Sequence, residues 1–251
     1  MKSPRAFYFK TDGFTIIELM VALVVLSTIL LIVTIALMGI GNIYDKGQIT
    51  STTQNITTSA INDVVNKIEF SGNIPNLVGA SGQNCNGTAP GSSWCESYQV
   101  GQSSSSPKAN VYAYCIGNYR YSFVLNREIV STSSDLTSSV FNQNPTYHAL
   151  YVDEYNNSSD CTPLDLFITN PELSQPNNIS GTNGRELLLP NMRLLNFSIT
   201  PNTITQTYTI NITAAYGSDE LLNTNSFSCK STSGQQFCAV STMSDTVMRR
   251  L

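Results

Sequence analysis

A glycine, a phenylalanine and a glutamate lie in a fixed order before a long apolar run, in the segment Gly13-Phe14-Thr15-Ile16-Ile17-Glu18-Leu19-Met20. No side chain from Leu19 to Tyr44 is charged. A carboxylate in hydrocarbon costs about 2.5–3.5 kcal/mol on insertion scales, and more when it has no partner. Glu18 is therefore either solvated at a membrane interface or paired with a cation. The chemistry that this segment favours is ion pairing at the edge of an apolar helix.

Six cysteines offer a second kind of chemistry, and all of them follow the apolar run: Cys85, Cys95, Cys115, Cys161, Cys229 and Cys238. This placement favours disulfides in an oxidising compartment. A zinc site is disfavoured, because no Cys-x-x-Cys pair occurs and the single histidine, His148, is not near a cysteine in sequence. Six cysteines allow 15 connectivities. Sequence proximity, and elimination for the last pair, favours Cys85 with Cys95, Cys229 with Cys238 and Cys115 with Cys161.

An enzyme is not expected from the residues that follow the apolar run. A Ser-His-Asp arrangement would need His148, but no serine lies in a nucleophile-elbow motif. No glycine-rich phosphate loop is present either. We therefore expect His148 to be a structural residue at the start of a strand.

Oxygen-bearing side chains gather between Asp153 and Asp160, and calcium requires six to eight oxygen ligands. The spacing is not that of an EF-hand loop, and the glycine of that loop is missing. A solvated polar turn is the favoured interpretation, because such residues are common in turns. We expect no cofactor, with calcium near Asp153 and Asp160 as the less favoured alternative.

The composition describes a polar surface with few charges. The chain has 251 residues and a formal net charge of −4, and only 12% of its residues are charged. Bulk nucleic-acid binding is therefore not expected. Ser, Thr, Asn and Gln are abundant, as on extracellular surfaces. Asn-x-Ser/Thr triplets, for example at Asn196 and Asn211, leave open a glycoprotein with a signal anchor, which ranks third because it gives Glu18 no role.

The apolar run is long enough to cross a membrane. The segment 19–38 contains twenty residues, which give about 30 Å as a helix, the thickness of the hydrocarbon core. Lys2, Arg5 and Lys10 precede it, against the single acid Asp12. The positive-inside rule therefore predicts a single-pass membrane protein, with its amino terminus in the cytoplasm and its carboxyl terminus outside.

The order of Gly13, Phe14 and Glu18 before an uninterrupted span resembles the type III signal of type IV pilins and pseudopilins. The resemblance covers about the first thirty residues. It implies a leader, residues 1–13, that the prepilin peptidase removes by cutting between Gly13 and Phe14 and methylating the new amine of Phe14. It also implies that Glu18 pairs with this amine on the adjacent subunit during assembly. Such a pair is worth far more in a low dielectric than in water.

Two further features bear on the kind of subunit. No proline lies between Pro4 and Pro75, which favours a minor pilin or a pseudopilin over a major pilin. The chain end 246–250 is similar to the ends of W-type minor pilins and J-type pseudopilins. The resemblance thus predicts a minor type IV pilin, assembled into or at the tip of an extracellular pilus through contacts with other pilin subunits, for priming, adhesion, motility or DNA uptake. A type II secretion pseudopilin, or a membrane-tethered adhesin outside any filament, remains the alternative.

The elements that must position these residues are one long helix and a set of strands. Apolar residues recur at helical spacing between Asp45 and Phe70, so the span is expected to continue as an amphipathic helix. Three glycines at 39, 41 and 47 predict local weakening and a bend. The helix is expected to end before Gly72 and Pro75.

The remainder of the chain predicts a long loop followed by antiparallel strands. Residues 79–107 are rich in Gly, Ser, Asn and Pro. Strands are expected at 111–116, 119–125, 147–153, 164–169, 185–189, 194–200, 208–215 and 237–248, the first two joined at Gly117-Asn118 and the last three as a meander. The expected fold is α+β and pilin-like. Its parts are a leader at 1–13, an assembly helix at 14–44, an amphipathic helix at 45–74 and a β-rich extracytoplasmic domain at 75–251.

Overall fold

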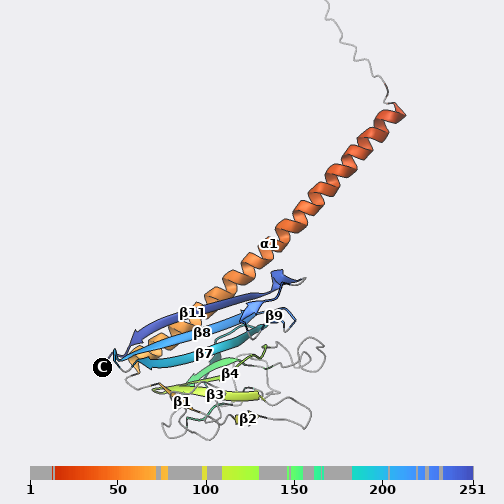
Figure 1. The fold of residues 1–251 in the computed structure, drawn as a ribbon. Helices are drawn as coiled ribbons and strands as arrows, with labels where there is room; N and C mark the ends of the chain where they lie inside the picture. Colours follow the sequence, from red (N-terminus) through yellow and green to blue (C-terminus); the bar gives the residue numbers. More distant parts are fainter. Residues whose placement is uncertain are drawn as a thin grey trace, which may run out of the picture. The chain divides into compact units, whose positions relative to one another are not determined.

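The computed structural model describes residues 13, 15–71, 75–78, 98–100, 109–129, 146, 148–154, 161–164, 166, 183–202, 204–218, 220–223, 226–231 and 234–250. It contains one long amino-terminal helix and antiparallel sheets, so the fold is α+β (Figure 1). The chain divides into two units, 1–44 and 45–251. Helix α1, Ile16–Phe70, contributes residues to both.

In the first unit, α1 begins with a side-chain cap and exposes its apolar residues. The backbone N–H of Glu18 donates to Thr15 Oγ1 over 3.3 Å and to the Thr15 carbonyl over 3.1 Å, as an N-cap residue requires. Ser27, Thr28 and Thr34 each donate their hydroxyl to a carbonyl three or four residues earlier, over 2.8 Å. The polar side chains of this apolar segment are therefore satisfied within the helix, as hydrocarbon surroundings demand.

In the second unit, the part of α1 from residue 45 to Phe70 packs one face into the core. Ala60, Ile61, Val64 and Ile68 are buried, as the helical spacing predicts. The same face also buries two polar residues, Thr53 and Thr57, which the spacing of apolar residues does not predict. Thr57 donates its hydroxyl to the Thr53 carbonyl over 2.7 Å, so no polar group is left unsatisfied there. The helix ends at Phe70, where the sequence predicts.

The larger sheet has the order β1-β3-β4-β5-β6 among the described residues, with β2 also paired to β3. All its pairs are antiparallel. The strands are β1 Asn76–Val78, β2 Tyr98–Val100, β3 Ala109–Ile116, β4 Tyr119–Val124, β5 Leu150–Glu154 and β6 Arg185–Glu186. Gly117, with φ +60°, opens the tight turn between β3 and β4. A side chain on Gly117 would strain this turn and lie 2.9 Å from Ser71 Cβ.

Several strand predictions for this sheet need correction. The segment 164–169 was expected as a strand, but neither Leu164 nor Leu166 is in one, and the other residues lie outside the described ranges. The Leu164 N–H donates to Ser122 Oγ over 3.0 Å, so a side chain replaces the ladder partner. β2 lies inside the predicted loop 79–107, whose other residues are not described. β5 begins three residues later than predicted.

The strand β6 is two residues long rather than the five predicted, and Glu186 explains why. Its carboxylate accepts the backbone N–H groups of Ala149, Leu150 and Leu188 over 2.9–3.0 Å. These donors are therefore satisfied by a side chain instead of a strand carbonyl. The pattern ends the ladder after Glu186.

The smaller sheet has the order β11-β8-β7 and is antiparallel throughout. Its strands are β7 Met192–Asn202, β8 Thr207–Tyr216 and β11 Ala239–Met248. The expected meander is interrupted between β8 and β11 by a hairpin, β9 Leu222–Asn223 with β10 Ser228–Cys229, and by the 3-10 helix η1 Gln235–Phe237. The hairpin was not predicted, because its strands are too short to show alternation.

Among the described residues of the second unit, four cysteines form two disulfides. Cys115 on β3 is bonded to Cys161, and Cys229 on β10 is bonded to Cys238, directly before β11. These are two of the pairs that the sequence analysis favours. Cys85 and Cys95 lie outside the described residues.

An aromatic cluster joins the two sheets. Phe197 on β7 makes edge-to-face contacts with Tyr114, Tyr121 and Phe123 of the larger sheet, at centroid distances of 5.0, 6.4 and 5.1 Å. All four side chains are almost completely buried. Such pairs contribute about 0.5–1.5 kcal/mol each beyond their area burial. The cluster therefore fixes how the sheets face one another.

Hydrogen bonds and an ion pair connect α1 to the residues that flank strand β11 at both of its ends. Lys46 Nζ donates to the Cys238 carbonyl and to the Gln235 carbonyl, just before the strand begins. Beyond the strand, Arg250 forms an ion pair with Glu69 over 2.5 Å, and its N–H donates to the Glu69 carbonyl over 3.1 Å. The strand therefore follows the helix from residue 46 to residue 69 (Figure 1).

Because two tyrosines are buried, we expect the folded state to lose stability at alkaline pH. Burial is the largest cause that raises the pKa of Tyr121 far above its usual value. The nearby Asp63 carboxylate, which accepts a hydrogen bond from the Tyr121 hydroxyl over 2.8 Å, raises this pKa further. Burial also raises the pKa of Tyr114. Above pH ~10 the unfolded chain loses these protons while the folded chain keeps them. Stability is therefore complete below pH ~10 and falls above it, by up to about 1.4 kcal/mol per pH unit for each tyrosine.

We expect Tyr121→Phe to remove one of these two contributions. The measurement is chemical denaturation of the full chain in detergent micelles at pH values from 7 to 11. The variant should be less stable at neutral pH, because it lacks the bond to Asp63, but should lose less stability as pH rises. Parallel profiles for the two proteins would contradict the assignment to Tyr121.

Candidate functional site

The described part of the amino-terminal motif places Glu18 in the first turn of α1. Gly13 and Glu18 are both exposed, and Phe14 lies outside the described residues. Thr15 and Glu18 have the spacing of a capping box, a pattern that the sequence analysis overlooked. An acidic side chain in the first helical turn also interacts favourably with the helix dipole. Glu18 therefore has a local role in starting the helix in addition to any role in pairing.

The helix that follows Glu18 is long and apolar enough to cross a membrane. An 18-residue window has a mean hydropathy of 2.9, and none of it is buried within the chain. The large apolar side chains from Ile16 to Tyr44 are 47–83% exposed. An apolar surface of this size is unfavourable in water, and a bilayer or neighbouring helices would shield it.

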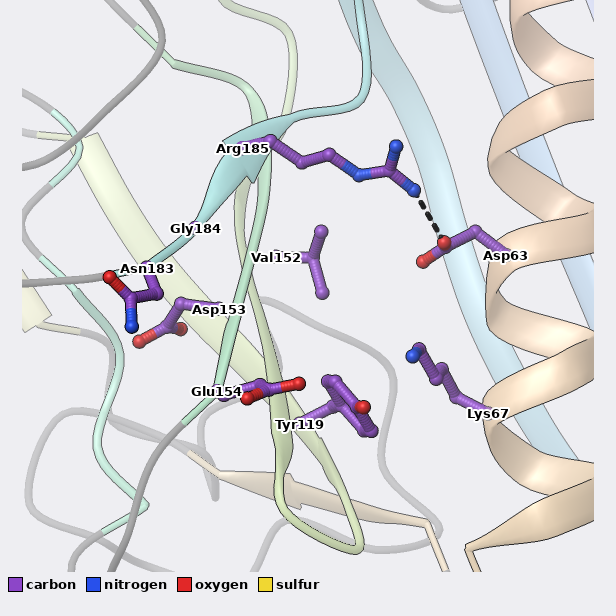
Figure 2. A pocket seen from close by; sticks show the side chains of 9 residues that line it. All are labelled: Asp63, Lys67, Tyr119, Val152, Asp153, Glu154, Asn183, Gly184 and Arg185. Atoms are coloured by element: carbon purple, nitrogen blue, oxygen red, sulfur yellow. Dashed lines mark hydrogen bonds and ion pairs between the residues drawn. The ribbon is translucent and has the colours of Figure 1, made fainter.

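A separate cavity of about 320 Å³ lies in the second unit, where α1 meets the larger sheet. Figure 2 shows its lining: Asp63, Lys67, Tyr119, Val152, Asp153, Glu154, Asn183, Gly184 and Arg185. Two of these side chains come from α1, and the others come from β4, β5, β6 and the residues before β6. No sequence motif connects these residues, which lie far apart in the chain, so the cavity could not be predicted from the sequence.

Asp63 is the polar centre of one wall of the cavity. Its carboxylate accepts the Tyr121 hydroxyl over 2.8 Å and a guanidinium N–H of Arg185 over 2.7 Å. The two bonds link α1 to β4 and to β6. Arg185 keeps its side chain 65% exposed, so the ion pair itself contributes little stability. Its effect is to orient the guanidinium along the cavity wall (Figure 2).

Lys67, four residues after Asp63 on α1, and Glu154, at the end of β5, are two further charged groups of the cavity (Figure 2). Lys67 Nζ lies 3.5 Å from the centroid of the Tyr119 ring, a cation–π contact. Among the described residues no carboxylate pairs with Lys67, and Glu154 at the end of β5 is exposed without an ion pair. The cavity thus presents an ammonium and a carboxylate that have no ion-pair partner within the described ranges.

Asp153, a candidate calcium ligand in the sequence analysis, is occupied by an arginine. Arg120 Nε and a terminal guanidinium nitrogen donate to its two carboxylate oxygens over 3.0 and 2.6 Å, and the pair is buried. A bidentate pair of this kind satisfies a buried carboxylate. Asp160 lies outside the described residues. No cluster of three potential metal ligands occurs in the described ranges.

The floor of the cavity requires a glycine at position 184. A Cβ atom there would lie 2.4 Å from Tyr151 Cε1 and 2.6 Å from the Val152 carbonyl oxygen. The second of these contacts is with backbone, which cannot rotate away. The absence of a side chain lets residues 183–185 lie directly on β5.

His148 is buried before β5, close to the position that the sequence analysis assigned to it. Its ring makes an edge-to-face contact with Tyr151 at 4.9 Å, and Nδ1 lies 3.4 Å from Glu186 Oε2. Glu186 is held by three backbone N–H groups, as described above. These contacts give His148 a structural role in positioning β5 and β6.

Comparisons with protein-family models, with curated proteins and with solved structures found no match for this chain.

Proposed function

We propose that this chain is a minor subunit of a type IV pilus, held in the inner membrane by its amino-terminal helix and then assembled into a filament. The observation that carries the proposal is an apolar helix, none of it buried in the most apolar window, with Glu18 in its first turn after Gly13-Phe14. In a bilayer, lipid covers this helix. In a filament, the helices of neighbouring subunits take the place of lipid.

The chemistry of assembly follows from the two charges at the start of the mature chain. Hydrolysis of the bond between Gly13 and Phe14 leaves a cationic amine on Phe14, which the peptidase then methylates. Glu18 of one subunit and this amine of the next neutralise each other, so neither charge is left unpaired in an apolar environment. The pair therefore sets the axial register between subunits.

The second unit is the part that faces outward in this proposal. It joins a helix face to antiparallel strands and holds two disulfides between described cysteines, which agrees with an oxidising compartment outside the cytoplasm. The unit is proposed to serve as a surface for binding or for contacts between subunits.

Amino-terminal sequencing and intact mass of the protein isolated from the membranes of the cells that make it test the proposal. We expect a chain that begins at methylated Phe14. A product that begins at Met1, or that has lost the helix up to Tyr44, would contradict it. Shearing the cells separates the alternatives, because a filament subunit leaves with the sheared fraction and a tethered adhesin stays with the membrane.

A further inference from the structure

The cavity beside α1 combines features that fit one class of small ligand. Its volume of about 320 Å³ is at the small end of the range for ligand sites. The apolar Val152 side chain lies at its centre (Figure 2), and charged or polar groups surround it. This combination of an apolar floor and a few directed polar groups is typical of binding sites for small molecules.

The cations of the cavity have unused donors. Lys67 is half-buried and contacts the face of the Tyr119 ring, which holds its position but neutralises no charge. Arg185 uses one guanidinium nitrogen for Asp63, and its other N–H groups have no hydrogen-bond partner within the described residues. Ammonium and guanidinium groups held in fixed positions recognise carboxylates through charge-assisted hydrogen bonds.

The other polar groups of the cavity can accept hydrogen bonds from a neutral donor. Glu154 offers carboxylate oxygens beside Tyr119, and Asn183 offers an amide that both donates and accepts. Glu154 would repel a dianion that filled the cavity, whereas it accepts hydroxyl groups readily. The ligand therefore needs one anionic group on the side of Lys67 and hydroxyl groups on the side of Glu154.

We propose that the cavity formed by Lys67, Tyr119, Val152, Glu154 and Arg185 binds a small sugar acid, an organic anion with one carboxylate and several hydroxyl groups. The carboxylate accepts hydrogen bonds from Lys67 and Arg185. The hydroxyl groups donate to Glu154, and the C–H face of the ring lies on Val152. Binding here is separate from assembly, because every residue of the cavity belongs to the unit 45–251.

Isothermal titration of the full chain in detergent micelles with D-glucuronate tests this proposal. D-glucose, which has the same ring without the carboxylate, and acetate, which has the carboxylate without the ring, are the matched probes. We expect glucuronate to bind at least about tenfold more tightly than either, the effect of one charge-assisted hydrogen bond. Absence of saturable glucuronate binding, or equal binding of glucose, would overturn the proposal, and so would tighter binding of the zwitterion glycine.

Variants of Lys67 test whether glucuronate binds in this cavity. Lys67→Met keeps the length and packing of the side chain but removes its charge, and should weaken glucuronate binding by about tenfold. Lys67→Arg should retain binding if the variant keeps the native circular-dichroism spectrum. Lys230→Met, outside the cavity, is the control and should bind as the unchanged protein does. If Lys67→Met binds glucuronate normally, the cavity is not the site.

Discussion

Glu18→Gln is expected to insert in the membrane and to be cut after Gly13, but to be nearly absent from sheared filaments. In the proposed filament, the substitution would leave the methylated amine of the neighbouring subunit unpaired in an apolar environment. An unpaired charge there costs about 2.5–3.5 kcal/mol, which corresponds to a loss of incorporation on the order of 100-fold. The measurement is the amount of the variant in the sheared fraction relative to the membrane fraction.

The choice of glutamine separates the two roles of residue 18. Glutamine serves as well as glutamate in a capping box, so the first turn of α1 is preserved while the charge is lost. Thr15→Ala is the reciprocal control, because it removes the cap and keeps the charge. The cap contributes about 0.5–2 kcal/mol, so this variant should assemble much better than Glu18→Gln. Equal incorporation of Glu18→Gln and the unchanged protein would refute a pairing role for Glu18.

Phe197→Ala is expected to lower the free energy of unfolding of the second unit by about 3–5 kcal/mol. Phe197 is completely buried and contacts three aromatic rings of the larger sheet. Alanine would leave a cavity between the two sheets and remove every one of these ring contacts. Chemical denaturation of the full chain in detergent, followed by the near-ultraviolet signal of the tyrosines, measures the change.

Two further substitutions show whether the loss comes from the cluster. Phe197→Leu fills much of the same volume and should cost less than Phe197→Ala. Phe237→Ala removes a phenylalanine that is 47% exposed, and should change stability by about 0.5 kcal/mol or less. Similar losses for Phe197→Ala and Phe237→Ala would show that Phe197 does not join the sheets.

The long elements were predictable from the sequence because their periodicity extends over many residues. The helical spacing of Ala60, Val64 and Ile68 places the buried face of α1, and the helix ends at Phe70 before the turn residues. The hairpin at Gly117-Asn118 was predictable for a different reason, since a glycine at the first central position permits a tight turn.

What the sequence did not reveal depends on single side chains that meet across long separations. Glu186 ends a strand by accepting three backbone N–H groups, and nothing in its neighbourhood in the sequence signals this. Arg120 and Asp153 become a pair only when β4 and β5 are adjacent. The pair shows that Asp153, for which the sequence offered calcium binding only as the less favoured alternative, is a partner for arginine in the fold.

The two candidate sites also differ in whether the sequence alone could predict them. Gly13, Phe14 and Glu18 lie within six consecutive positions and can be recognised as a motif, so the assembly hypothesis could be formed from the sequence alone. The cavity depends on Lys67 and Glu154, which are far apart in the chain and come together only through the packing of α1 on the larger sheet. The cavity could therefore be found only in the structure.

The contacts of Lys46 and Glu69 on α1 with the residues that flank β11 have a mechanical consequence. In the proposed filament, tension would pull each subunit through its helix, and these two attachments would pass part of that force to β11. Because β11 is paired with β8 over ten residue pairs, force along the strand loads those hydrogen bonds in shear, so that they must rupture together. Pulling along the helix axis should therefore meet greater resistance than peeling β11 away from one end.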